Sequence, residues 1–100
     1  MEKKIAHYDL NDVKKSVLTL GIDAFTETAL RGMDLMGIEA EEGLSIVLSL
    51  QRNMLYKSMT THSNSRLWQD VYHAPCADGK MAYIKVTLQE RAIVIQFKEK

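Results

Sequence analysis

The hydrophobic pattern of this chain changes its period near residue 50, and that change limits the folds open to it. In the first half, apolar residues recur every three or four positions, which is the spacing of one face of an α-helix. In the second half they alternate with polar residues, which is the spacing of a strand with one buried face. A run of helices followed by a run of strands indicates an α+β protein.

Three helices are predicted in the first half. Asp9 or Asn11 can serve as the N-cap of the first helix, and Gly21 ends it. Thr26 can cap the second helix, which stops at Gly37. The third begins with a cluster of glutamates, which suits the helix dipole. The apolar positions expected to face the core are Leu10, Val13, Val17 and Leu20, then Ala29, Leu30, Met33 and Met36, and then Leu44, Val47 and Leu48 in a helix over about 41–50, with the methionines as core filler.

Four strands are predicted in the second half. Consecutive strands favour an antiparallel sheet, so we expect N-terminal helices packed on one face of a C-terminal antiparallel sheet. No repeat, low-complexity segment or linker interrupts the chain, which predicts a single domain over 1–100, helical to about residue 50. The strands are expected at about Met54–Thr60, Leu67–His73, Lys80–Leu88 and Arg91–Lys98.

Composition indicates the cellular compartment of the protein and the charge of its binding partner. The single cysteine, Cys76, cannot form an internal disulfide, so it is expected to be an ordinary loop residue of a cytoplasmic protein. No run approaches the roughly 18–20 apolar residues of a membrane span, and no signal-peptide pattern is visible. Residues 1–50 hold five basic and nine acidic side chains, whereas residues 51–100 hold eight and four. The basic half indicates an anionic partner.

Alternation in the last two strands separates a core face from an open face. Between Lys80 and Leu88, even-numbered apolar residues face one way, while Tyr83 and Lys85 face the other. In the last strand the same reasoning leaves Gln96 and Lys98 opposite the apolar set. Because the apolar sets must lie against the helices, these four polar side chains are expected on the uncovered face of the sheet.

Turn lengths extend this face to the two earlier strands. A three-residue loop at Ala77–Gly79 puts glycine at a left-handed position and pairs Tyr83 with His73. A wider loop through "HAPCADG" would instead slide Gln69 towards Tyr83. A loop at His62–Asn64 places Lys57 directly opposite Gln69.

The last turn is open to two lengths. A two-residue turn at Gln89–Glu90 pairs Tyr83 with Gln96, whereas a four-residue loop keeps the same parity. Either length leaves one polar face. Its expected members are Lys57, Gln69, Tyr83, Lys85, Gln96 and Lys98.

This face has the chemistry of a single-stranded nucleic-acid platform. Lysines can meet phosphates, a tyrosine ring can stack on a base, and amides can read base edges or the 2′-OH. On the pattern alone, a solvated sheet face with ordinary lysines is the favoured interpretation. The sequence has no glycine-rich phosphate loop, HExxH or CxxC, and His73 with Cys76 does not define a zinc site.

Three segments, "YKSMTT", "WQDVY" and "FKEK", closely resemble the MqsR toxin family, and the resemblance spans essentially the whole chain. It implies a RelE-like fold and a ribosome-independent endoribonuclease that cuts mRNA at GC-containing triplets. It also implies a protein antitoxin of the MqsA type, with a zinc-binding domain and a helix-turn-helix domain. DNA would be contacted only through that antitoxin, and no membrane is involved.

The resemblance also assigns residue roles. The catalytic residues it implies are Lys57, Gln69, Tyr83 and Lys98, acting without metal or cofactor through attack of the RNA 2′-OH on the adjacent phosphate. Lys85, Gln96 and His73 are expected to bind RNA. Since free lysine and tyrosine have pKa values near 10, the general base is missing from this set, and His73 is a hypothesis for it. The alternative function is a non-catalytic module whose sheet face acts with the antitoxin in operon regulation.

Overall fold

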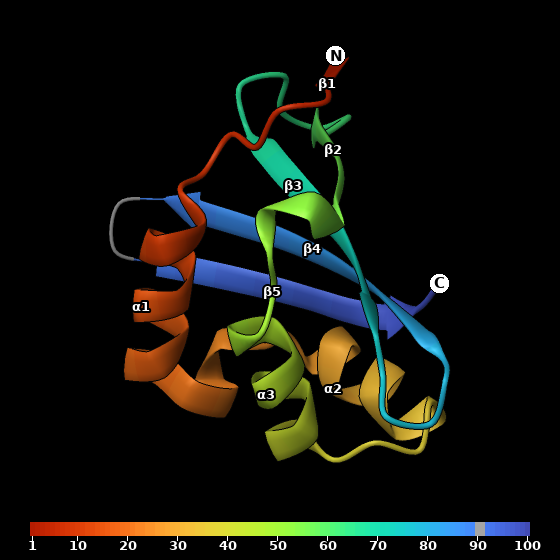
Figure 1. Ribbon diagram of the computed structural model, residues 1–100. Helices are drawn as coiled ribbons and strands as arrows, with labels where there is room; N and C mark the ends of the chain where they lie inside the picture. The colour runs from red at the N-terminus through yellow and green to blue at the C-terminus, as the bar shows by residue number, and fades with distance from the viewer. Residues whose placement is uncertain (90–91) are drawn as a thin grey trace.

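The computed structural model describes residues 1–89 and 92–100 and confirms the α+β class: three helices pack against a five-stranded antiparallel sheet (Figure 1). The strands follow one another across the sheet in chain order. None of the helices in the described part of the chain is long and apolar enough to cross a bilayer. The helices are α1 Leu10–Leu20, α2 Glu27–Leu35 and α3 Ala40–Leu48, with short 3-10 helices at Gly21–Ala24 and Arg52–Met54, and the strands are β1 Glu2–Lys3, β2 Leu55–Thr60, β3 Trp68–Pro75, β4 Met81–Gln89 and β5 Ala92–Glu99.

The helix ends form where local chemistry favours them. Asp9 is the N-cap of α1, and its carboxylate accepts a hydrogen bond from the Asn11 amide at 2.8 Å. Thr26 caps α2 in the same way by accepting from the Ala29 amide at 3.0 Å. Gly21 follows α1 with φ at 59°, a left-handed value that glycine adopts without a Cβ clash.

The core lies between the helices and one face of the sheet. Met33 and Met36 are buried in it, which confirms their expected role as core filler. Cys76 lies in the loop directly after β3, as predicted, but its side chain is buried, and its amide donates to the Lys80 carbonyl at 2.8 Å. The side chains that the sheet contributes to this hydrophobic core are Tyr72, Ala74, Ala82, Ile84, Val86, Ile93, Ile95 and Phe97.

The connection between β3 and β4 is the predicted three-residue loop. Cys76 pairs with Lys80, and Gly79 has φ at 89°. His73 is therefore directly opposite Tyr83, and the wider loop that would bring Gln69 there was wrong. Glycine at the left-handed position lets the strands turn within three residues.

The connection between β2 and β3 is longer than predicted. Lys57 lies opposite Val71 and Gln69 opposite Met59, so the direct Lys57–Gln69 pair was wrong. The loop is stabilised from within, because the Thr61 hydroxyl donates to the Asn64 carbonyl and accepts from its amide. The register shifts by two residues, which preserves the face of every side chain.

The connection between β4 and β5 shows a similar two-residue difference. Tyr83 lies opposite Lys98 rather than opposite Gln96, and Leu88 pairs with Ile93. The predicted tight turn includes Glu90, which lies outside the described residues, as does Arg91 at the start of the predicted strand. A shift of two residues again keeps every side chain on its predicted face, as both predicted loop lengths did.

A short strand at the start of the chain was not predicted. β1 pairs antiparallel with β2, so that Glu2 lies opposite Met59 and Lys3 opposite Ser58. The segment after β1 is held by Asp70, whose carboxylate accepts hydrogen bonds from the His7 and Tyr8 amides. Only two residues long, β1 has too little alternation to be found by pattern.

Candidate functional site

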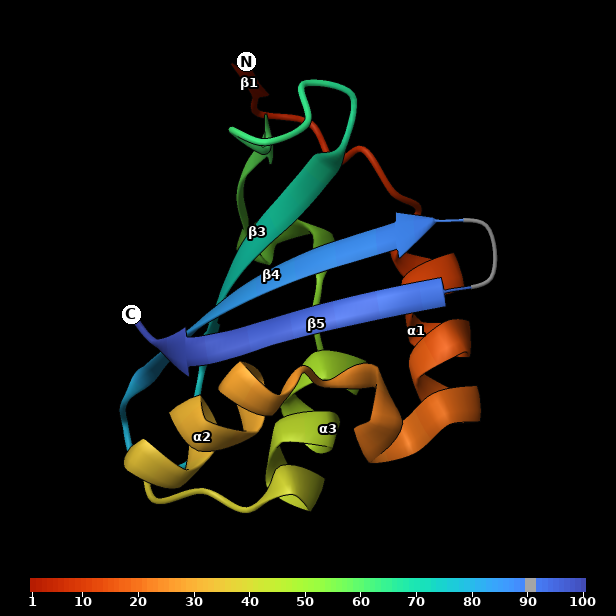
Figure 2. The same ribbon diagram turned by 180° about the vertical axis from the view of Figure 1, so that it is seen from behind.

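The face of the sheet away from the helices carries all of the predicted site residues. Figure 2 views the molecule from this side, where no helix lies in front of β4 or β5. The strand pairing arranges the side chains in three cross-strand rows. The rows are Glu2, Met59 and Gln69; then Lys57, Val71, Lys85 and Gln96; and then His73, Tyr83 and Lys98.

The strand pairing assigns the predicted site residues to different rows, whereas the sequence placed them only on the same face. Tyr83 and Lys98 are direct neighbours, and Lys57 lies one row away. Gln69 and the row of Tyr83 are four residues apart along β3, which is roughly 13 Å. Gln69 is therefore too far from Tyr83 for the two side chains to belong to one small site.

Three aromatic rings form a column along one end of this face. The Tyr56 and His73 rings stack with their centroids 4.5 Å apart and their planes 20° apart. The Tyr83 ring, on the neighbouring strand β4, has its centroid 5.6 Å from that of His73. Lysine ammonium groups lie over the outer rings, with Lys98 5.1 Å from Tyr83 and Lys57 5.5 Å from Tyr56. Such rings offer stacking surfaces for bases, beside cations for phosphates.

The sequence missed Tyr56. Simple alternation from Lys57 would turn its ring to the other face, but the pairing of β2 with β3 shifts between Leu55 and Lys57. A β-bulge of this kind lets two successive side chains take the same side. The only sequence signal is the tyrosine beside Lys57, and the bulge that re-aims it depends on the neighbouring strand.

His73 is enclosed by this column. Its Nε2 atom is buried and has no hydrogen-bond partner among the described residues. Burial lowers the pKa of His73 from its ordinary value, and the nearby Lys100 charge lowers it further. The imidazole is therefore held neutral, which suits a stacked ring within the platform.

Lys57 has an unexpected partner in β1. The Glu2 Oε1 atom lies 3.0 Å from the Lys57 Nζ atom, and the two side chains are 55% and 20% exposed. The hydrogen bond from Lys57 and its charge lower the pKa of Glu2, while the same hydrogen bond raises the pKa of Lys57. Near neutral pH the pair is an ammonium next to a carboxylate.

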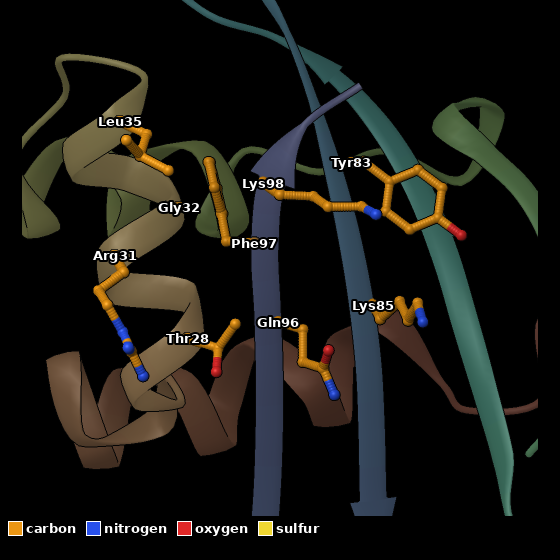
Figure 3. Close-up of a pocket in the computed structure, with 9 residues that line it drawn as sticks. All are labelled: Thr28, Arg31, Gly32, Leu35, Tyr83, Lys85, Gln96, Phe97 and Lys98. Atoms are coloured by element: carbon orange, nitrogen blue, oxygen red, sulfur yellow. The ribbon is translucent and has the colours of Figure 1, made fainter.

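A groove of about 490 Å³ adjoins Tyr83 and Lys98 (Figure 3). It runs between α2 and β5, where Gly32 lets the helix approach closely: a Cβ at that position would lie 2.2 Å from the Phe97 carbonyl oxygen. In the view of Figure 3 the Lys98 side chain extends towards the Tyr83 ring. The lining residues are Thr28, Arg31, Gly32 and Leu35 from α2 and Tyr83, Lys85, Gln96, Phe97 and Lys98 from the sheet.

The groove combines cations with polar and apolar walls. Three positive side chains line it, namely Arg31, Lys85 and Lys98. Arg31 is also 3.9 Å from Glu27, but both side chains are largely exposed, so that ion pair is weak. A volume of this size accommodates one nucleotide beside the row of Tyr83 and Lys98.

Metal ligands do not gather on this face. Within 1–89 and 92–100 no group of three or more histidine, cysteine, aspartate or glutamate side chains is placed to hold a metal ion. His73 lies on the open face, whereas Cys76 is buried in the core. Their spacing of three in the sequence therefore brings them to different environments.

Fold and site together define a class: a small α+β protein whose uncovered sheet face combines lysines with stacked aromatic rings. The family model described as "Motility quorum-sensing regulator, toxin of MqsA" matches residues 5–99. The chain is also 36% identical over 100 residues to the mRNA interferase toxin MqsR of Escherichia coli (strain K12), and the match covers the whole of both chains. The chain belongs to the MqsR toxin family.

Proposed function

We propose that this protein is an mRNA-cleaving toxin of a toxin–antitoxin pair, acting in the cytoplasm on single-stranded RNA without a ribosome or a metal ion. The observation that carries the proposal is the open face, where Lys57, Tyr83 and Lys98 lie in adjacent rows next to a column of stacked rings. The similarity to a relative named an mRNA interferase toxin supports it. The preferred cleavage sites would be GC-containing triplets.

The rows fit the geometry of a bound RNA strand. Lys57 on β2 and Lys98 on β5 are separated by three inter-strand spacings, about 14 Å, and by one row, about 7 Å, so their long side chains would reach towards one phosphate from opposite sides of Tyr83. Both ammonium groups would stabilise the negative charge that develops on the phosphorane, an effect worth about 10²–10³ in rate per well-placed donor. Tyr83, next to Lys98, would orient the phosphate or donate a proton to the leaving 5′-oxygen.

The remaining side chains would bind the flanking nucleotides. Gln69, about 13 Å from the row of Tyr83, would hold a base or a 2′-OH on one side of the cut. Lys85 and Gln96 would bind on the other side through the groove next to α2. His73, neutral and enclosed between two tyrosines, would support the stacking surface rather than take a proton, because its Nε2 atom is buried.

The reaction is an attack of the ribose 2′-oxygen on the adjacent phosphorus. The 2′-O–P bond forms and the P–O5′ bond breaks, which leaves a 2′,3′-cyclic phosphate and a 5′-OH end. This chemistry needs charge stabilisation and proton transfer, and in this proposal side chains of the open face supply both.

The test uses purified protein, its Lys57→Ala variant and a defined single-stranded RNA with GC-containing triplets, all in excess EDTA. The wild type should produce discrete cuts with 5′-OH ends, and Lys57→Ala should reduce the rate about 10²–10³-fold. Lys15→Ala, an exposed lysine of α1, is the matched control and should cut normally. Equal cutting by wild type and Lys57→Ala would locate the activity elsewhere, and RNA binding without any cut would favour the non-catalytic module.

The partner we propose is an MqsA-type antitoxin with a zinc-binding domain and a helix-turn-helix domain. It would neutralise the toxin, and contact of the complex with DNA would occur only through the antitoxin. Adding equimolar antitoxin to the cleavage reaction should stop it, and unchanged cleavage would contradict neutralisation.

A further inference from the structure

The open face lacks an obvious group to accept the proton of the ribose 2′-OH. Lysine and tyrosine side chains carry their protons at neutral pH, since their ordinary pKa values are near 10. Pairing with Glu2 raises the pKa of Lys57 and makes it a still poorer base. The Nε2 atom of His73 is buried, and its ring stacks on Tyr56 in a different row from Lys57. Within the described strands, the titratable side chains of this face are Glu2, Tyr56, Lys57, His73, Tyr83, Lys85 and Lys98.

Glu2 is the single carboxylate among those side chains, and strand pairing places it on the open face, one row from Lys57. In β1 it lies opposite Met59, in the row that contains Gln69. The next residue, Lys3, points the other way, with its ammonium 4.2 Å from the Trp68 ring on the helix-covered face. Backbone pairing continues at the Thr60 amide, which donates to the Met1 carbonyl at 3.0 Å. The orientation of Glu2 is therefore set by the sheet.

The geometry of the pair also suits proton transfer. Glu2 Oε1 lies 3.0 Å from Lys57 Nζ, and among the described contacts only this oxygen of the carboxylate has a partner. In a reactive conformer of RNA the 2′-oxygen lies about 3–3.5 Å from the phosphorus that it attacks. A phosphate held by Lys57 thus brings its 2′-OH within reach of a carboxylate that contacts the same ammonium.

We propose that Glu2 is a catalytic residue, the general base that removes the 2′-OH proton while Lys57 holds the phosphate. This inference rests on the proposed RNA cleavage. The 2′-OH proton moves to the Glu2 carboxylate as the 2′-O–P bond forms. The electron pair of the breaking P–O5′ bond stays on O5′, which takes a proton from Tyr83 or Lys98. The carboxylic acid and the proton donor then exchange protons with water, and no redox partner is needed.

The lowered pKa of Glu2 is consistent with this role, because the carboxylate stays ionised through the neutral range. Because the Glu2 side chain is 55% exposed, the ion pair is expected to contribute little to stability. A carboxylate at this position also repels RNA phosphates that approach elsewhere.

The decisive experiment compares Glu2→Gln with wild type in single-turnover cleavage from pH 4 to 8. Glutamine keeps a side-chain oxygen for the Lys57 ammonium but cannot accept the proton, so a purely positioning role would survive the change. A general base predicts a rate 10²–10⁴-fold lower and loss of the acidic limb of the pH–rate profile. Binding of an RNA with 2′-deoxy substitution at the cleavage site should stay equal or become tighter. Glu41→Gln, an exposed glutamate of α3, is the matched control.

The outcomes separate this inference from the proposed function. If wild type cuts and Lys57→Ala does not, but Glu2→Gln cuts at the wild-type rate with the same pH profile, Glu2 is not the base. A faster and tighter-binding Glu2→Gln would show that the carboxylate only competes with phosphate, and would also overturn the inference. A wild type that binds RNA and never cuts it would remove both proposals.

Discussion

The two faces of the sheet use polar groups in opposite ways, and adjacent residues of β3 show the contrast. Asp70 lies on the helix-covered face, is 1% exposed, and accepts hydrogen bonds from two backbone amides and the Ser58 hydroxyl. Gln69 lies on the open face, is only partly buried, and has Met59 as its cross-strand neighbour. The buried carboxylate holds the first residues of the chain on the sheet, whereas the open-face amide remains available to a ligand.

The two faces also differ in what satisfies their charged and polar side chains. On the covered face a polar group has to be satisfied by the protein, because water is excluded. On the open face, water can satisfy a lysine that has no protein partner, whereas Lys57 is paired with Glu2. Changes on the covered face should therefore affect stability, and changes on the open face should affect cleavage.

Asp70→Ala should give the largest loss of stability, about 3 kcal/mol, because several buried donors lose their acceptor together. Chemical unfolding in urea, followed by the fluorescence of Trp68, measures it. Gln69→Ala is the matched control, and its free energy of unfolding should stay within about 0.5 kcal/mol of wild type. Equal losses for the two variants would break the distinction between the faces.

Lys98→Ala should reduce the cleavage rate about 10²-fold, or about 2.7 kcal/mol in activation free energy, through loss of charge stabilisation at the phosphate. The urea midpoint should be unchanged, since the side chain is exposed. Single-turnover cleavage measures the first and unfolding the second. A variant that lost stability and kept its rate would assign Lys98 to the fold rather than to the site.

Gly32→Ala tests the close contact between α2 and β5 and should lower the free energy of unfolding by about 2 kcal/mol. The added Cβ would meet the Phe97 carbonyl at 2.2 Å, so α2 would have to move away from β5. That movement should also widen the groove next to Lys98 and weaken RNA binding. Thr28→Ala, on the same helix and groove wall, should leave stability nearly unchanged. Wild-type stability of Gly32→Ala would contradict the close packing.

The smallest predicted effect is a loss of stability at alkaline pH that depends on Tyr72 and is absent at neutral pH. Burial, together with the nearby Asp70 and Asp9 charges, raises the pKa of Tyr72 to about 12. The unfolded chain ionises this phenol near pH 10. Stability from the group is therefore fully present below pH 10 and is lost as pH rises towards 12. In an absorbance titration at 295 nm, Tyr72→Phe should remove the phenol that ionises near pH 12, and loss of a lower transition instead would contradict the shift.

Local sequence determined the elements of this protein and the face that each strand residue takes. The caps at Asp9 and Thr26 follow from hydrogen bonds within a few residues, and they were predictable. Alternation is equally local, so the open face with Tyr83, Lys85, Gln96 and Lys98 could be assigned without knowing the pairing, and assumed turn lengths extended it to Lys57 and Gln69. Errors of register by two residues left this assignment intact, because strand parity repeats every two residues.

Tertiary structure decided which of those residues meet. Lys57 lies opposite Val71 because the loop after β2 is longer than the shortest turn, and Tyr56 joins the aromatic column because of a bulge set by β3. Glu2 reaches Lys57 through a two-residue strand, 55 positions away in the chain. Contacts at such separation depend on loop closure and on the packing of the whole sheet, so hydrophobic periodicity carries no information about them.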